Sequence, residues 1–205
     1  FHYKETRNEL IGQDYSSKLS PWLNLGCISP RQVFAAVKQA ENIGGANAST
    51  EWLIVELMWR DFFQFCALER GPELFFGVAN RLSEQSSSLS LDKGNACTRW
   101  QQGATGHPFL DANMRELAAT GFMSNRGRQN AASAFIHDMG CDWRLGALWF
   151  EQQLIDYDPA SNYGNWQYIA GIHANSRGGS WFNLDKQAAI YDPLQKYQAL
   201  WLTKS

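Results

Sequence analysis

The sequence lacks the features that define several common classes of protein. Its formal net charge is −2 over 205 residues, which excludes a wholly basic nucleic-acid binder but leaves room for a local basic patch. No run of 18 apolar residues occurs and residues 1–20 are polar and charged, so neither a membrane span nor a secretory signal is predicted. We therefore expect an intracellular protein that stays out of membranes, cytoplasmic with an organelle as the alternative.

Cysteine is sparse and widely spaced. Cys27, Cys66, Cys97 and Cys141 lie 39, 31 and 44 residues apart, with no CxxC pair. This spacing fits neither a zinc site nor a dense disulfide framework. We therefore expect buried or incidental thiols and no metal site.

Aromatic residues, in contrast, are abundant, and helix signals recur along the chain. Nine Trp, twelve Phe and seven Tyr exclude a disordered chain. Caps, prolines at first helical positions and terminal glycines predict helices over residues 30–39, 49 or 50–70, 108–121, 125–139, 143–154, 161–170 and 184–190. We expect one all-α domain over residues 1–205, an irregular helical bundle, with a loop-rich or mobile segment at about 81–97.

Two loops concentrate small polar residues where chemistry could use them. Residues 15–20 combine hydroxyl groups, a lysine and free backbone N–H groups, which suits a phosphate; an ordinary turn is the alternative. The second loop covers residues 156–165. No Walker loop, GxGxxG, HExxH or GxSxG motif occurs, which removes the commonest motif-based assignments to an enzyme class.

Eight segments follow one another in an order that belongs to one family. They are residues 3–8 (YKETRN), 15–23 (YSSKLSPWL), 26–31 (GCISPR), 56–63 (ELMWRDFF), 105–115 (TGHPFLDANMR), 125–130 (NRGRQN), 142–144 (DWR) and 156–168 (DYDPASNYGNWQY). In these segments the chain resembles the photolyase/cryptochrome family, and residues 124–130 and 161–166 resemble the DASH-type cryptochromes most closely. The match is to the C-terminal, all-helical FAD-binding domain, and the N-terminal α/β antenna domain of the family has no counterpart here.

The resemblance implies a U-shaped FAD in the middle of the helical domain. The implied cofactor-binding residues are Tyr3, Ser16, Ser17, Lys18, Leu19, Ser20, Asn125, Arg128, Asp156, Tyr157, Asp158 and Asn162. Residues 16–20 would cradle the diphosphate, and Arg128 paired with Asp156 would hold a fixed positive group beside a ring that must carry an extra electron. An ordinary interhelical salt bridge is the alternative for that pair.

Asn162 is the most diagnostic residue within this resemblance. It matches the position beside the flavin N5 atom, where repair members of the family carry Asn and plant signalling cryptochromes carry Asp. A neutral amide can hydrogen-bond N5 whether or not that nitrogen is protonated, which favours the anionic reduced flavin. A capping role at a helix N-terminus is the alternative.

For the substrate, the resemblance implies a cavity that receives a flipped pyrimidine dimer. The implied DNA-binding residues are Arg7, Glu56, Trp59, Arg60, Asn125, Arg126, Gln129 and Tyr168. Trp59 and Tyr168 would offer flat faces to the two bases, and Arg7 and Arg126 would contact the backbone. An ordinary core position is the alternative for Trp59, since Leu53, Leu57, Met58, Phe62 and Phe65 lie around it at helical spacing.

The family's electron relay is only partly matched. Trp166 and Trp143 match its inner and middle tryptophans, but the outer one lies ten residues before the position of Trp100, and residue 90 is Ser. Another aromatic, such as Trp149 or Trp181, would have to replace it.

Together the resemblance implies light-driven, FAD-dependent repair of cyclobutane pyrimidine dimers by a monomer, in single-stranded DNA where flipping costs least. Trp166, Trp143, Asn162 and Glu56 are the implied catalytic residues. One alternative is a blue-light photoreceptor or nucleic-acid-binding signalling protein that binds FAD without repair turnover. A second is a degenerate domain that has lost the flavin.

Overall fold

Helices account for all the regular structure in the part of the chain that the computed structural model describes, residues 2–13, 15–76, 91–172 and 178–203. They are α1 (Tyr3–Thr6), α2 (Ser20–Asn24), α3 (Pro30–Gly44), α4 (Ala48–Arg70), α5 (Glu73–Phe76), α7 (Leu91–Gln102), α8 (Pro108–Thr120), α9 (Asn125–Ser133), η2 (Ala134–Asp138), α10 (Trp143–Gln153), α11 (Pro159–Ala170), α12 (Leu184–Tyr191) and α13 (Lys196–Leu202). The all-α prediction is confirmed.

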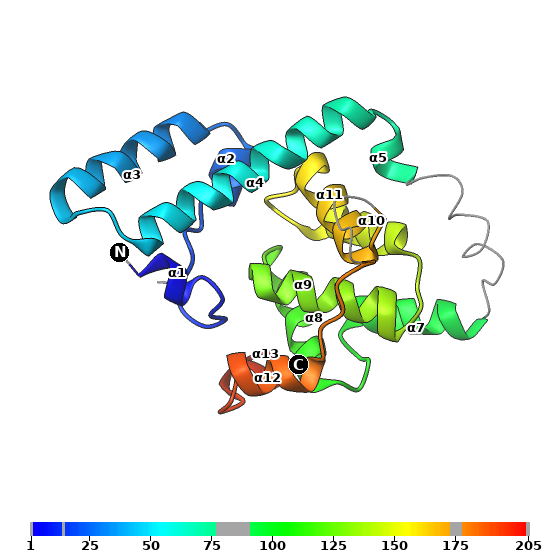
Figure 1. Ribbon diagram of the computed structural model, residues 1–205. Helices are drawn as coiled ribbons and strands as arrows, with labels where there is room; N and C mark the ends of the chain where they lie inside the picture. The colour runs from blue at the N-terminus through cyan, green and yellow to red at the C-terminus, as the bar shows by residue number, and fades with distance from the viewer. Residues whose placement is uncertain (1, 14, 77–90, 173–177, 204–205) are drawn as a thin grey trace.

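The helices form one main bundle with an arm (Figure 1). Helices α7–α11 lie in the bundle, α12 and α13 lie together below it, and α3 with the first part of α4 extends away to one side. The second part of α4 packs against α11, so this long helix joins the arm to the bundle. No helix among the described residues has the length and apolar character needed to cross a membrane.

Local capping explains where the helices begin. Ser29 caps α3 through its hydroxyl, which accepts from the backbone N–H of Gln32 at 3.2 Å, and Pro30 follows at the first helical position. Helix α3 continues to Gly44, past the predicted end at residue 39. Asn47, rather than Ser49 or Thr50, caps α4, because its side-chain oxygen accepts from both of their N–H groups while Thr50 completes the capping box.

Three tryptophans, Trp100, Trp143 and Trp166, are 2% exposed or less and lie in the main core cluster. Helices α10 and α11 approach closely over Gly146, where an added Cβ would lie 2.2 Å from Cη2 of Trp166. A second, smaller cluster fastens α13 to α8 through Tyr197 and Phe109.

Two sequence predictions about elements are corrected here. The predicted loop-rich segment at 81–97 is helical from Leu91 onward, because Ala96, Cys97 and Trp100 pack on the core at helical spacing; its first part, through residue 90, lies outside the described residues. The predicted helix over 125–139 changes to a π-helix at Ala134, where the N–H of Met139 donates to the carbonyl of Ala134 at 3.0 Å.

The packing of α4 on α11 shows which face of this helix is buried. Phe63 is buried and packs so closely on α11 that a Cβ on Gly164 would lie 2.4 Å from its ring. Because a helix turns 100° per residue, Met58, Phe62 and Phe65 then lie off this face and are exposed at 63%, 39% and 69%. Apolar spacing alone does not distinguish between these faces.

Candidate functional site

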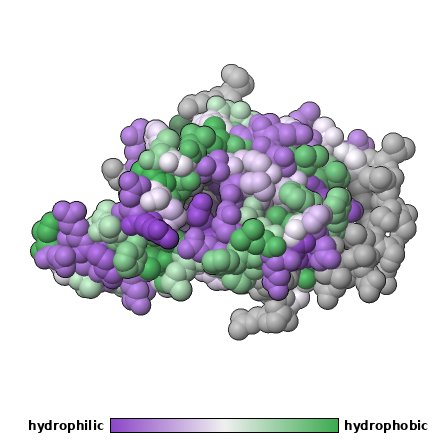
Figure 2. All heavy atoms as spheres, turned by 90° about the horizontal axis from the view of Figure 1, so that it is seen from above, coloured by the Kyte–Doolittle hydropathy of each residue, from purple (hydrophilic) through white to green (hydrophobic). Residues whose placement is uncertain are grey.

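One cavity of about 460 Å³ lies between α4, the 15–20 loop, α9 and α11. This volume is typical of pockets that hold cofactors or drug-sized ligands, roughly 300–1,000 Å³. Figure 2, which views the molecule from above, shows a hollow near its middle with mostly hydrophilic residues around it. A smaller cavity of about 120 Å³ shares several of the same walls, among them Asn125, Arg128 and Asp156.

Nearly all the predicted site residues meet at these two cavities. The larger one is lined by Tyr3, Arg7, Ser16, Ser17, Lys18, Leu19, Ser20, Glu56, Trp59, Arg60, Asn125, Arg126, Arg128, Gln129, Asp156, Asp158 and Tyr168. Tyr157, Asn162 and Trp166 line the smaller one. Trp143 is the exception, since it lies buried in the core at the start of α10.

The 15–20 loop has a backbone suited to an anion. Ser16 and Lys18 have φ values of 59° and 54°, in the region that non-glycine residues seldom occupy, whereas Leu19 has φ −84°. Alternating positive and negative φ turns neighbouring N–H groups toward one side and forms a concavity that binds anions. The backbone of this loop is therefore shaped to receive an anion.

The Lys18 ammonium group lies in this loop among aromatic rings. Its Nζ is 3.1 Å from the centroid of the Tyr15 ring and 4.8 Å from that of Phe122. Burial lowers the pKa of Lys18 to about 8, and the nearby Glu116 opposes that shift. An anionic ligand in the cavity would favour the charged form.

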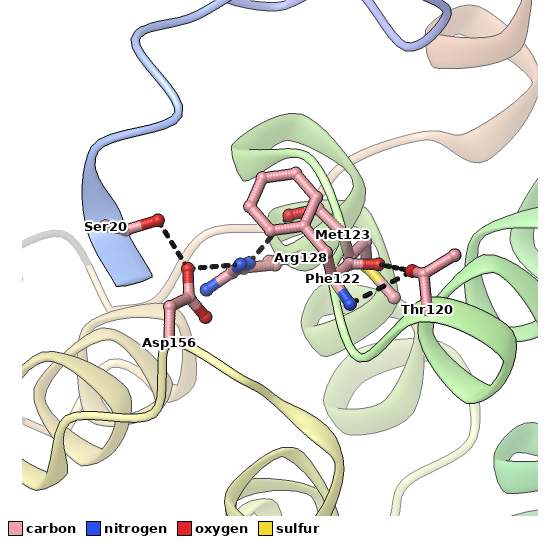
Figure 3. A network of polar contacts seen from close by, with 6 residues as sticks. All are labelled: Ser20, Thr120, Phe122, Met123, Arg128 and Asp156. Atoms are coloured by element: carbon pink, nitrogen blue, oxygen red, sulfur yellow. Dashed lines mark hydrogen bonds and ion pairs between the residues drawn. The ribbon is translucent and has the colours of Figure 1, made fainter. Parts of the chain in front are cut away.

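A buried ion pair forms the floor beside this loop (Figure 3). Arg128 Nη2 donates to Asp156 Oδ2 at 2.8 Å, and Arg128 Nε donates to the carbonyl of Met123 at 2.9 Å. The Ser20 hydroxyl donates to the same Asp156 oxygen at 2.6 Å, and the Asp156 side chain is 1% exposed. The predicted Arg128–Asp156 ion pair is thus present, with its carboxylate buried and its guanidinium 25% exposed.

Several buried polar atoms on the cavity walls have no hydrogen-bond partner among the described residues. They are Asp156 Oδ1, Gln129 Oε1 and Arg126 Nε. Buried polar groups are paired in the great majority of native structures, so these atoms match the donors and acceptors of a polar ligand. A flavin carries both kinds of group, and the residues present therefore fit FAD.

The structure shows which residue caps α11, a role that the sequence left open for Asn162. Asp158 caps α11 by accepting from the N–H of Ser161 at 2.7 Å, and it also accepts from Gln64 Nε2 at 3.0 Å. Asn162 is not the cap, because it lies inside α11 and its amide donates to the carbonyl of Ala147 at 2.9 Å. The capping alternative for Asn162 is therefore wrong.

The opposite wall of the cavity is aromatic and partly open to solvent. Trp59 is 44% exposed, so its core alternative is also wrong. Its ring centroid lies 6.3 Å from that of Tyr168, with the planes at 74°. Flat apolar faces at the mouth of a cavity suit stacking by planar groups.

The charged residues Glu56 and Arg126 at the cavity already have partners within the protein. Glu56 accepts from Arg7 in an ion pair and from Trp52 Nε1 at 2.9 Å. The guanidinium of Arg126 lies 5.0 Å from the centroid of the Tyr191 ring, and burial lowers its pKa. Burial and the Glu56 charge raise the pKa of Tyr3 to about 12, so this phenol stays neutral.

The two predicted relay tryptophans each contact other aromatic rings. Trp166 makes ring contacts with Phe150, Phe135 and Trp100, whose centroids lie at 5.2, 5.9 and 6.2 Å. Trp143 contacts the ring of Tyr163 at 6.3 Å. Residue 90, the expected place of the outer member, lies outside the described residues.

Sequence reasoning missed several residues that line the cavity. Among these are Trp52, Phe122, Ser161 and Asn165. Trp52 was the most accessible to prediction, since it lies four residues before Glu56 on the same helix face. Phe122 carries no comparable signal, because it reaches the cavity through the turn after α8.

Comparison with known proteins places this arrangement in a family. The family described as "FAD binding domain of DNA photolyase" matches residues 52–204. The chain is 52% identical over 203 residues to a "Cryptochrome DASH" of Synechocystis, and 50% identical over 202 residues to a "Cryptochrome DASH, chloroplastic/mitochondrial" of Arabidopsis thaliana. These alignments cover 98% of this chain but 40% and 35% of the two relatives, so the chain spans about two fifths of their length or less.

Solved structures agree with the sequence matches. A Synechocystis cryptochrome superposes with a TM-score of 0.88 at 49% identity, over 98% of this chain and 41% of that one. A bacterial class III photolyase from Agrobacterium tumefaciens gives a TM-score of 0.87 at 34% identity, with the same coverage of both chains. With its helical fold and its polar-and-aromatic cavity, the chain belongs to the photolyase/cryptochrome family and carries the FAD-binding domain of that family, similar to the DASH cryptochromes.

Proposed function

We propose that the protein is a light-driven lyase that splits cyclobutane pyrimidine dimers in single-stranded DNA. The observation that carries the proposal is that the Arg128–Asp156 ion pair, the exposed ring of Trp59 and the half-buried ring of Tyr168 line one cavity. A cofactor beside Arg128 and Asp156 and the two linked bases of a dimer beside Trp59 and Tyr168 would then lie in one cavity. When bound and reduced, the flavin supplies on illumination the electron that opens the cyclobutane ring.

The residues of this chain would hold the cofactor in position and set the charge around it. The 15–20 loop would hold the diphosphate, because its backbone conformation forms an anion-binding concavity. Arg128, fixed by Asp156 and the Met123 carbonyl, would keep a positive charge beside the ring system. The Asn162 amide, anchored on Ala147, is neutral at every ordinary pH and would not supply a proton.

At the mouth, Trp59 and Tyr168 would each accept one base of the dimer. Glu56 would accept from the pyrimidine edge while Arg7 and Trp52 hold its carboxylate in place. Single-stranded DNA is favoured because a base outside a duplex needs no unpairing, which otherwise costs a few kcal/mol.

The experiment compares DNA binding by the parent protein with DNA binding by one variant. Trp59→Ala is expected to weaken binding of a dimer-containing oligothymidylate by roughly 5- to 150-fold, since stacking is worth about 1–3 kcal/mol per base. It should leave FAD in place, because Trp59 belongs to α4 and the 15–20 loop would hold the diphosphate. Trp181→Ala, an exposed tryptophan outside the cavity, is the matched control.

Equal binding of damaged and undamaged oligonucleotides by the parent, with its flavin fully reduced, would overturn the proposal. That result would favour the photoreceptor alternative. Failure of the parent to retain FAD at all would favour the degenerate-domain alternative instead.

A further inference from the structure

Two of the four cysteines, 44 residues apart in sequence, meet in the core. Cys97 lies on α7 and is half-buried, and Cys141 lies in the turn before α10 and is buried. Their sulfur atoms are 2.9 Å apart, and both side chains are thiols. A disulfide bond has an S–S length of about 2.05 Å, so closing it requires a movement of less than about 1 Å.

We propose that Cys97 and Cys141 form a reversible disulfide site, with a hydroperoxide as the two-electron oxidant. One thiolate attacks the peroxide oxygen and becomes a sulfenic acid as the O–O bond breaks and water or an alcohol leaves. The second thiolate then attacks that sulfur, the S–S bond forms, and hydroxide leaves as water. Two thiols are oxidised and one peroxide is reduced.

The exposure of the two thiols indicates the order of these events. Cys97 is half-buried, whereas Cys141 is 7% exposed, so the oxidant reaches Cys97 first and Cys141 resolves the sulfenic acid. Cys27 is exposed and Cys66 is half-buried, but neither makes a sulfur–sulfur contact within the described part of the chain. Proximity therefore selects Cys97 and Cys141 among the four.

The bond would join the two segments that carry core tryptophans. Trp100 follows Cys97 by one helical turn, and Trp143 follows Cys141 by two residues. Cross-linking a loop of this length removes conformational freedom from the unfolded chain, so the oxidised protein should unfold at a higher temperature. The inference is independent of the proposed function, since it rests on the thiols alone.

The test is site-resolved oxidation of the full chain. The reduced protein is treated with an equimolar amount of hydrogen peroxide, alkylated, digested with trypsin without reduction and analysed by mass spectrometry. The expected product joins peptides 94–99 and 129–144 with a loss of about 2 Da, while Cys27 and Cys66 remain alkylated. The unfolding temperature should rise by about 5–10 °C and return after dithiothreitol.

Two variants keep the test decisive. Cys27→Ser with Cys66→Ser should oxidise and gain stability like the parent, whereas Cys97→Ser should lose both the cross-link and the temperature shift. Cys97 is the partly exposed member of the pair, so its replacement disturbs packing less than that of Cys141. Over-oxidised Cys97 without a cross-link, or equal cross-linking of Cys27 or Cys66 in the folded protein, would overturn the proposal.

Discussion

Asp156 uses one carboxylate oxygen for Arg128 and Ser20 and presents the other, unpartnered among the described residues, to the cavity. Replacing it by Asn keeps the shape but removes the charge that fixes the guanidinium. Because hydrogen bonds to charged groups are worth about 1.5–3 kcal/mol, we expect Asp156→Asn to bind FAD roughly 10- to 100-fold more weakly.

Flavin content after gel filtration and the dissociation constant measured by flavin fluorescence check this prediction. Asp142→Asn is the control, since Asp142 also pairs with an arginine, Arg144, but lies outside both cavities. A variant that holds FAD and photoreduces like the parent would show that the Arg128–Asp156 pair is only structural.

Trp166 lines the smaller cavity and is 2% exposed, so it is the described tryptophan placed to pass an electron to a ligand there. We expect Trp166→Phe to suppress photoreduction of oxidised FAD under blue light with an external reductant, followed by absorbance. Trp143→Phe should slow it as well if the implied relay holds.

The ring contact between Trp166 and Trp100 offers a competing route. Loss of photoreduction in Trp100→Phe, with Trp143→Phe unchanged, would contradict the relay assigned from the family resemblance. Trp22→Phe is the control for general loss of a tryptophan, because Trp22 is 55% exposed and lines neither cavity.

At the scale of elements, a buried carboxyl group joins α13 to α8. Tyr197 donates to Glu116 Oε2 at 2.6 Å, and both residues are buried. Burial raises the pKa of Glu116 to about 7, partly opposed by the Tyr197 hydrogen bond and by Lys18 and Arg128. The carboxyl group is therefore protonated in the folded protein at pH values where it is ionised in the unfolded chain.

This difference gives a signed pH dependence. A raised folded-state pKa stabilises the fold below the unfolded value near 4.5, and that stabilisation is lost as the pH rises toward 7. Glu116→Gln stays neutral and can still accept from Tyr197. We therefore expect its free energy of unfolding to decrease less with rising pH, and to exceed that of the parent at pH 8 by about 3 kcal/mol.

Urea unfolding at pH 5, 6, 7 and 8 measures this effect. Glu51→Gln, at an exposed position in the first turn of α4, should follow the parent at every pH. An unchanged slope in Glu116→Gln would mean that the buried carboxyl group titrates at its ordinary pKa.

At the scale of the whole molecule, charge limits how the protein can meet DNA. The formal net charge is −2, and the basic side chains at the cavity are partly engaged: Arg7 with Glu56, Arg60 with Asp61, and Arg126 over aromatic rings. Among the arginines predicted to contact DNA, these three would neutralise phosphates. We expect log Kd for a dimer-containing single strand to change with log salt concentration by a slope of only about 2.

Binding titrations between 50 and 200 mM salt check the prediction, and Arg60→Gln should reduce the slope by about 0.7. A slope near that of a fully basic binder would mean that phosphates are held by a surface other than this cavity. A matched titration with undamaged strand separates charge from recognition of the lesion.

Much of the fold could be predicted from the sequence, because its signals are local. Ser29 with Pro30 fixes the start of α3, and Asp142 fixes that of α10, through bonds within one turn. The family segments likewise predicted which side chains belong to the site, and all but Trp143 line the two cavities.

Burial and pairing, in contrast, depend on what lies across the interface, and only the tertiary structure decided them. The helical spacing in α4 is equally compatible with burying Met58 or Phe63, and contact with α11 selects Phe63. The same reason applies to Cys97 and Cys141, whose 44-residue separation gave no sign that their sulfurs meet. Local sequence sets the direction of each side chain along its helix, whereas the packing of distant helices determines its neighbour.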